Sequence, residues 1–191
     1  MHGAAIPSSD GDRRAVPLRT PRLRLAPVSA PDLEELFALH ADPRAFAEDL
    51  TEPLTERAQM RWVLRQWLES WRRHGTGYLT VRARDEATAG LPPGLLGVVG
   101  LTPLELEGRP ALSAYWRLAP EVRGHGIATE AMRAVLADPR LGASDREVVA
   151  VTAVGNGASR ALATRLGFTP APPQREVPGG RSGDVMLIRQ R

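Results

Sequence analysis

Residues 118–131 read LAPEVRGHGIATEA and mark the point where a strand ends in a glycine-containing loop and a helix begins. The first backbone N–H groups of such a helix converge at its positive end, which suits a bound anion. Gly124 and Gly126 let the backbone approach the anion because they carry no Cβ, and Ala128 is small for the same reason. Arg123 adds a charge-assisted contact. The stretch therefore predicts a phosphate-binding loop.

Other loops share some of these features. An ordinary strand-to-helix turn also uses glycine, and from the loop alone it stays open as an alternative. A Rossmann fingerprint fits poorly, because Thr129 stands where the third glycine belongs and the loop follows an antiparallel meander. A Walker loop is excluded, since no Gly-Lys-Ser/Thr follows and the chain contains no lysine.

The apolar residues before this loop follow first the period of helices and then that of strands. A short strand around Leu23 and Leu25 precedes a helix that opens at Pro31 and Asp32. A second helix is expected from a cap at Thr55, with Gly75 at its end. Three strands of an antiparallel meander are expected at 78–84, 95–101 and 111–118.

After the loop, helices and strands alternate. The pattern predicts a helix over 126–137, a buried strand over 147–154, a helix over 158–166 and a closing strand over 184–188. Strand, helix, strand in that order implies a right-handed crossover and a locally parallel pair. The predicted fold class is α/β (α+β), with a mixed, mostly antiparallel sheet and flanking helices.

Length and composition favour one domain. The chain has 191 residues, of which 42% are hydrophobic, enough for one core over residues 17–191. Residues 1–16 are rich in Gly, Ser, Asp and Pro and are expected to form a flexible leader. The chain shows neither a run of about eighteen apolar residues nor the apolar middle of a signal peptide. A cytoplasmic protein that does not bind membranes is therefore expected.

Charge and ligand residues exclude several function classes. The chain has no cysteine, and its 4 histidines show no metal-ligand spacing, so no metal is expected. All 25 basic residues are arginine, but they are interleaved with 22 acidic residues and the formal net charge is only +3. Nucleic-acid binding is not expected, because such proteins gather their basic residues on one face.

The loop closely resembles the acyl-CoA-binding signature Arg/Gln-x-x-Gly-x-Gly/Ala of the GNAT N-acetyltransferases, here RGHGIA at residues 123–128. NGAS at 156–159 and LGF at 166–168 follow in the family's order and approximate spacing. LRTPRLRL at 18–25 looks like the opening of the branch that contains the ribosomal-protein N-terminal (Rim-type) acetyltransferases. The resemblance covers about residues 18–190.

The resemblance implies that strands 111–118 and 147–154 splay apart and that acetyl-CoA inserts its pantetheine arm between them. The Leu118 N–H then donates to the thioester carbonyl, and loss of such a donor costs about 3 kcal/mol. Asn156 either bonds the pantetheine or the strand edge, or caps the next helix, and both can hold. The residues implied in acetyl-CoA binding are Leu118, Arg123, Gly124, His125, Gly126, Ile127, Ala128, Thr129, Asn156 and Ser159.

Acetyl transfer by direct attack in a ternary complex needs a base for the amine and an acid for the thiolate. Many relatives carry the acid as a tyrosine seven residues after the asparagine, but Ala163 stands there in this chain. Ser159 replaces it as the candidate acid, with helix capping as its structural alternative. The candidate base is Glu176, and less so Glu130; a solvated surface carboxylate is the alternative for either.

The acceptor implied by the resemblance is a primary amine of a protein N-terminus or a small molecule. Arg117 is a candidate for selecting an anionic acceptor. Five aromatic residues are candidates for lining the acceptor site, although the helical stripe favours core positions for the first three: Trp62, Trp67, Trp71, Tyr115 and Trp116. A CoA-binding protein without catalysis and an unrelated basic binding module remain as alternative functions, and a monomer or a homodimer is expected.

Overall fold

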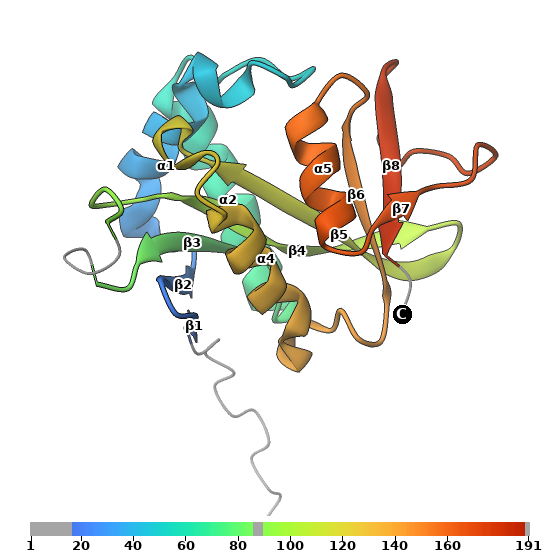
Figure 1. The fold of residues 1–191 in the computed structure, drawn as a ribbon, viewed down its shortest axis with the longest axis horizontal. Helices are drawn as coiled ribbons and strands as arrows, with labels where there is room; N and C mark the ends of the chain where they lie inside the picture. The colour runs from blue at the N-terminus through green and yellow to red at the C-terminus, as the bar shows by residue number, and fades with distance from the viewer. Residues whose placement is uncertain (1–16, 86–89, 190–191) are drawn as a thin grey trace, which may run out of the picture.

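The computed structural model describes residues 17–85 and 90–189, so the expected leader at 1–16 lies outside the described residues. Eight strands form one sheet in the order β1-β2-β3-β4-β5-β6-β8-β7 (Figure 1). Every neighbouring pair is antiparallel except β5 and β6. The predicted α/β (α+β) class with a mixed, mostly antiparallel sheet and flanking helices is confirmed.

The predicted elements are present, with shifted ends. The strands are β1 (Leu18–Arg19), β2 (Leu23–Pro27), β3 (Tyr78–Ala83), β4 (Gly97–Leu106), β5 (Arg109–Leu118), β6 (Glu147–Ala153), β7 (Thr169–Pro170) and β8 (Asp184–Arg189). The α-helices are α1 (Leu33–Ala41), α2 (Arg57–His74), α4 (Ile127–Ala137) and α5 (Gly157–Arg165). Single 3₁₀ turns are η1 (Ala30–Asp32), η2 (Pro43–Phe46), η3 (Pro120–Val122) and η4 (Pro139–Leu141).

The N-cap of helix α2 lies one residue later than expected. Glu56, not Thr55, is the N-cap residue, and the Gln59 side chain accepts hydrogen bonds from the backbone N–H groups of both. A glutamine three residues after the cap is the second half of a capping box, which explains the shift. Gly75 ends the helix with φ +64°, as predicted from the left-handed conformation that glycine tolerates.

Strand β4 is longer than the sequence predicts, although it contains Pro103. Ala119 N donates to Leu96 O, and hydrogen-bonded pairs alternate along an antiparallel ladder. Pro103, opposite Leu112, therefore falls at a non-hydrogen-bonded position of the β4–β5 ladder, and its missing N–H costs no bond there. The two strands meet in a hairpin whose central residues, 107 and 108, both have positive φ.

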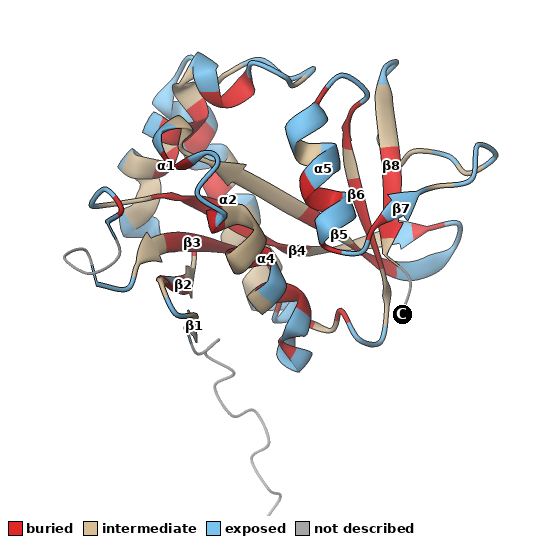
Figure 2. Ribbon diagram, viewed as in Figure 1, coloured by how far each residue is buried: buried red, intermediate tan, exposed pale blue. Residues whose placement is uncertain are grey.

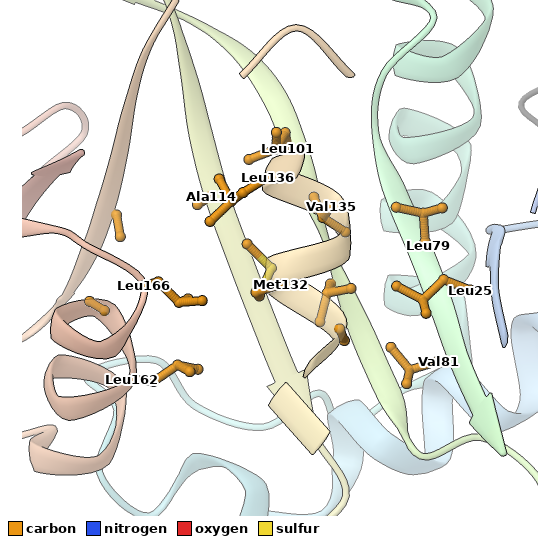
Figure 3. Close-up of a cluster of buried hydrophobic side chains, with 14 of the residues drawn as sticks. Leu25, Leu79, Val81, Leu101, Ala114, Met132, Val135, Leu136, Leu162 and Leu166 are labelled. Atoms are coloured by element: carbon orange, nitrogen blue, oxygen red, sulfur yellow. The ribbon is translucent and has the colours of Figure 1, made fainter. Parts of the chain in front are cut away.

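Two helix layers cover the sheet. Helices α4 and α5 cover one face, where apolar side chains of the sheet meet those of the helices in one cluster (Figure 3). Helices α1 and α2 pack on the other face around Val98. The labelled members of the first cluster are Leu25, Leu79, Val81, Leu101, Ala114, Met132, Val135, Leu136, Leu162 and Leu166. Burial of each leucine stabilises the fold by about 1.5–3 kcal/mol.

The tryptophans of α2 divide between core and surface. Trp67 and Trp71 pack against the buried clusters, and Trp71 Nε1 donates to Tyr78 O at 2.8 Å. Trp62 is 61% exposed, so its prediction as a core residue was wrong. Trp62 lies with the exposed residues Arg61, Arg65 and Gln66 of α2. The strands β3 and β4, by contrast, are mostly buried (Figure 2).

No helix within residues 17–85 and 90–189 is long and apolar enough to cross a membrane. Within the same ranges, no group of three or more His, Asp or Glu side chains is placed to hold a metal ion.

Candidate active site

Strands β5 and β6 pair with each other at one end only. They pair in parallel at residues 111–113 and 147–149, and no pairing continues beyond. Strand β6 instead pairs with β8 over residues 148–153. The later parts of β5 and β6 therefore separate and leave a wedge in the sheet, as the resemblance implied.

The loop between β5 and α4 has the expected conformation. Gly124 and Gly126 have φ of +78° and +74°, which L side chains rarely adopt. Gly126 is the N-cap residue of α4, and no side chain caps this helix. A Cβ added at Gly126 would have one heavy atom within 4 Å, Arg22 Nη2 at 3.6 Å. The N-terminus of α4 therefore keeps unsatisfied N–H groups beside open space.

A cavity of about 1270 Å³ connects this helix end with the wedge. Nine of the residues implied in acetyl-CoA binding line it: Leu118, Arg123, Gly124, Gly126, Ile127, Ala128, Thr129, Asn156 and Ser159. Arginines from several elements line it as well: Arg19, Arg22, Arg123, Arg133 and Arg165. The cavity is therefore basic around α4, and suits a polyphosphate there.

His125 and Glu176 do not line this cavity. The exposed His125 ring bonds to Arg123 O through Nδ1 at 2.9 Å. Glu176 is exposed, and the neighbouring Arg175 forms ion pairs with Glu107 and Glu147. Because Glu147 begins the joined part of β6, these pairs hold the segment away from the wedge. The structure does not bring Glu176 into the site.

Glu130 lines the cavity but is fully engaged. Its Oε1 accepts from Thr20 Oγ1 at 2.5 Å and from Arg22 N at 3.0 Å, and its Oε2 accepts from Arg22 Nε at 2.7 Å. Burial acts to raise the pKa of Glu130, but the hydrogen bonds and charge of these partners outweigh it, and the pKa is lowered. Glu130 therefore attaches the β1–β2 turn to α4 and lies beside the N-terminus of this helix rather than at the wedge.

The Leu118 backbone N–H points toward the wedge. Leu118 lies opposite Gly97, and the adjacent pair Leu96–Ala119 is hydrogen bonded. By the alternation of an antiparallel ladder, the N–H of Leu118 points away from β4, on the side where β6 has separated. A Cβ at Gly97 would lie 2.5 Å from Arg117 O, so glycine is needed opposite this position.

Asn156 caps helix α5. Its Oδ1 accepts from Ser159 N at 2.9 Å, and its Nδ2 donates to Asp49 Oδ1 at 3.2 Å. Of its two predicted roles, the structure displays the cap. Ser159 Oγ accepts from Trp116 Nε1 at 3.1 Å, which leaves the hydroxyl proton of Ser159 for another acceptor. Ala163 is buried in the core and brings no polar group to the site.

Arg117 is committed to internal partners. It donates to Tyr115 Oη, Ala45 O and Asp49 Oδ2 at 2.9, 2.6 and 2.7 Å, and its guanidinium carbon lies 3.6 Å from the Phe46 ring centre. Its side chain is 10% exposed. Arg117 therefore holds the loop after α1 against β5, which argues against its candidate role in selecting an anionic acceptor.

The same network continues to His40. Its Nδ1 lies 2.8 Å from Leu36 O and its Nε2 lies 3.2 Å from Tyr115 Oη. Burial lowers the pKa of His40 to about 4; the hydrogen bond to Leu36 opposes this shift and the charge of Arg117 adds to it. The neutral ring therefore donates a hydrogen bond to Leu36 O through Nδ1 and accepts one from the Tyr115 hydroxyl through Nε2.

Sequence reasoning missed Asp49 and Arg22. Asp49 lies in the cavity wall, between Arg117 and Asn156, but the segment around it has no periodic pattern and reads as a polar loop. Arg22 appears in the sequence only as part of the stretch at 18–25, whereas its side chain reaches Glu130 and His125 O. No local signal marks either residue, because their partners are distant in the chain.

A family model described as an acetyltransferase (GNAT) domain matches residues 22–169. No significant match is found among curated protein sequences. Among solved structures, a GnaT-family acetyltransferase from Bordetella pertussis is 26% identical, with a TM-score of 0.72, and the match covers 92% of this chain and 99% of that one.

Two further structures share the fold. The ribosomal L7/L12 α-N-protein acetyltransferase RimL, in complex with coenzyme A, is 20% identical with a TM-score of 0.69, over 89% of this chain and 94% of that one. A spermidine N-acetyltransferase from Vibrio cholerae, in complex with CoA and spermine, is 18% identical with a TM-score of 0.63, over 87% and 93%.

Proposed function

The chain belongs to the acetyltransferase (GNAT) domain family, and on that premise we propose that it transfers an acetyl group from acetyl-CoA to a primary amine. The acceptor is the N-terminus of a protein or a small molecule, and the amine attacks directly in a ternary complex. The observation that carries the proposal is the cavity of about 1270 Å³, which joins an uncapped helix N-terminus to the wedge between two strands.

The residues around α4 suit the phosphates of acetyl-CoA. The first N–H groups of α4 and the small residues 126 and 128 form a cradle for the pyrophosphate, and Arg123 stands at its edge. Arg123 donates to Arg44 O at 2.8 Å through one nitrogen, so its guanidinium keeps other N–H groups for an anion. The RimL and spermidine N-acetyltransferase structures are both complexes with CoA.

The residues at the wedge suit acyl transfer. Leu118 N–H is directed to the side where the thioester of acetyl-CoA would lie, and it would stabilise the oxyanion that develops on the carbonyl oxygen. Ser159 would donate its hydroxyl proton to the departing thiolate, since Trp116 already donates to its oxygen. Asn156 would act through the cap of α5 and through Asp49, rather than by direct contact with acetyl-CoA.

The acceptor is a finer question within this proposal. Residues 18–25 resemble the Rim-type branch, which favours a protein N-terminus. RimL and the spermidine enzyme nevertheless fit the chain to a similar extent, with TM-scores of 0.69 and 0.63, so the fold supports both kinds of amine. The proposal therefore includes both.

A second candidate function is CoA binding without catalysis. It is favoured by Ala163, which is fully buried and leaves the site without the tyrosine of many relatives. In that case Ser159 has no part in proton transfer, and acetyl-CoA would bind without being consumed.

Two measurements test the proposal. Acetyl-CoA should raise the melting temperature of the protein, and mixtures with primary amines should release CoA, followed with a thiol reagent. Stabilisation without release for any amine would favour the second candidate. No stabilisation by acetyl-CoA at any concentration up to its solubility would contradict both functions.

A further inference from the structure

A second, smaller cavity of about 220 Å³ lies against the same wedge. Its walls include residues 114–117 of β5 and 151–153 of β6, with the loop at 49–51 and the turn at 181–184. Four residues line both cavities: Asp49, Trp116, Arg117 and Ser159. The two cavities therefore meet at these side chains, beside the proposed proton donor Ser159.

Asp49 is fixed at this junction. Its Oδ2 accepts from Arg117 Nη2 at 2.7 Å and its Oδ1 accepts from Asn156 Nδ2 at 3.2 Å. A carboxylate has about four lone-pair sites, so each oxygen keeps room for another donor. The side chain is 21% exposed, whereas that of Arg117 is 10% exposed. The carboxylate is thus held in place on one side and open on the other.

The cations that line the smaller cavity are Arg117, which is paired with Asp49, and Arg181, which is paired with Asp184. The other carboxylates nearby are engaged elsewhere or turned to solvent. Asp184 accepts from Arg181 N and Nε at 3.2 and 3.4 Å, and its side chain is 4% exposed. Glu48 is exposed and lies 3.4 Å from Ala158 N on the side of the larger cavity. Among the described residues, Asp49 is the one carboxylate that lines both cavities. Its two partners, Arg117 and Asn156, come from other parts of the chain.

We propose that Asp49 binds the ammonium group of the acceptor and accepts its proton, and that the acceptor is an unhindered primary alkylamine whose amine end enters the 220 Å³ cavity. This inference rests on the proposed acetyl transfer and names the acceptor class for it. A cavity of this size is smaller than the 300–1000 Å³ of sites for drug-sized ligands, so it suits the end of a chain rather than a branched or substituted amine.

The proposed step conserves atoms and protons. The ammonium gives one proton to Asp49, and the neutral nitrogen forms a bond to the thioester carbonyl carbon. The C–S bond then breaks, the thiolate takes a proton from Ser159, and the serine oxygen recovers one from the nitrogen. Asp49 finally releases its proton to solvent. The products are the amide, the free thiol and one proton.

The test uses the full chain and two amines of matched shape, ethylamine and 2,2,2-trifluoroethylamine. The first is an ammonium at pH 7 and the second is largely neutral. In Asp49→Asn, kcat/KM for ethylamine should fall at least about 100-fold, the usual contribution of a positioned base. The value for trifluoroethylamine should change little, because that amine has no proton to lose before attack. Glu52→Gln, an exposed charge change on the same loop, should behave as wild type with both amines.

A purely structural role predicts a different result. Loss of the partner of Arg117 would lower activity with both amines equally, and such an equal loss would overturn the inference. So would a loss that stays constant as the pH is raised toward the pKa of an alkylamine, about 10, where the amine is already neutral. The melting temperature and its rise with acetyl-CoA are measured on each variant to show that it is folded.

The two proposals fail in different ways. Absence of any stabilisation by acetyl-CoA would contradict the proposed function and the inference with it. Stabilisation by acetyl-CoA with CoA release for branched amines but not for ethylamine would overturn the acceptor class alone.

Discussion

Helices α4 and α5 both place their first turns in the wall of the large cavity, but the two turns are completed differently. Helix α4 begins at Gly126 with no capping side chain. Helix α5 begins with Asn156 Oδ1 bonded to Ser159 N, and Glu48 Oε2 lies 3.4 Å from Ala158 N. Both helix ends carry the same positive partial charge. The difference favours anion binding at α4, where N–H groups are left unsatisfied, whereas α5 presents a side-chain hydroxyl to the cavity.

The largest expected effect comes from placing a side chain at the uncapped N-terminus of α4. Acetyl-CoA should stabilise the wild-type protein by about 2.7 kcal/mol at a hundred times its dissociation constant. Gly126→Val should lose most of this gain, because a branched side chain takes the space beside the N–H groups and strains a φ of +74°. Thermal unfolding with and without acetyl-CoA measures the difference.

Gly108→Val is the matched control for backbone strain. Gly108 has the same φ of +74°, and an added Cβ would have no heavy atom within 4 Å. It lies in the β4–β5 hairpin rather than at a helix end. It should be destabilised and still respond to acetyl-CoA as wild type does. A normal response in folded Gly126→Val would mean that the pyrophosphate does not bind at α4.

The hydroxyl of α5 gives the second expected effect. Ser159→Ala should lower kcat about 100-fold, the lower range for a positioned proton donor, with little change in the affinity for acetyl-CoA. The reason is that the donor acts on the leaving thiolate, chiefly in the transition state. Steady-state kinetics with a saturating amine measures kcat, and Ser159→Thr should recover much of the activity. Unchanged turnover in Ser159→Ala would assign the proton to solvent.

The hydrogen-bond network of His40, Tyr115 and Arg117 predicts that the stability of the protein depends on pH. The pKa of His40 is about 4 in the folded protein and 6.5 in the unfolded chain, so the unfolded state binds more protons between these values. The free energy of unfolding should therefore fall as the pH drops from 6.5 toward 4, by about 2 kcal/mol between pH 7 and pH 5. Urea unfolding at the two pH values measures this.

His40→Gln should remove most of that dependence, although it is expected to be less stable at pH 7. His74→Gln, a change at an exposed histidine, should keep it. An equal loss of stability on acidification in His40→Gln and wild type would show that His40 is not the group responsible.

The smallest expected effect comes from removing the side-chain cap of α5. Asn156→Ala should lower the free energy of unfolding by about 1 kcal/mol, the usual worth of an N-cap side chain. The gain from acetyl-CoA should persist, because the cosubstrate is assigned to α4. Asn156→Ser keeps a capping oxygen but not the reach to Asp49, and it should recover the stability. Loss of acetyl-CoA binding in Asn156→Ala would make α5 part of the anion site.

Local patterns predicted most elements because each depends on residues a few positions apart. The end of α2 follows from Gly75, and the hairpin after β4 follows from glycine at position 108. The length of β4 was not predicted, because Pro103 usually ends a strand and its place in the ladder depends on a partner strand. The prediction of Trp62 as a core residue was wrong for a similar reason. Which side of α2 is buried depends on the elements that pack against the helix, and these are distant in the chain.

The loop before α4 was predicted from the sequence because its parts are consecutive. Its glycines, Arg123 and the start of α4 lie within a few residues, and the conformation that they need is encoded locally. The distance of the candidate base Glu176 from the cavity could not be predicted, for the opposite reason. The ion pairs of the neighbouring Arg175 with Glu107 and Glu147 depend on strands brought together by the sheet.

The sequence alone determined the class of fold, the order of its elements and the conformation of the loop before α4, because hydrophobic period, caps and glycines act over short distances. The tertiary structure decided which side chains share the wedge. Asn156 and Asp49 are separated by 107 residues and Arg117 and Asp49 by 68. A carboxylate in a polar loop carries no mark of such partners, because its chemistry is set by the charges and hydrogen bonds that folding places around it.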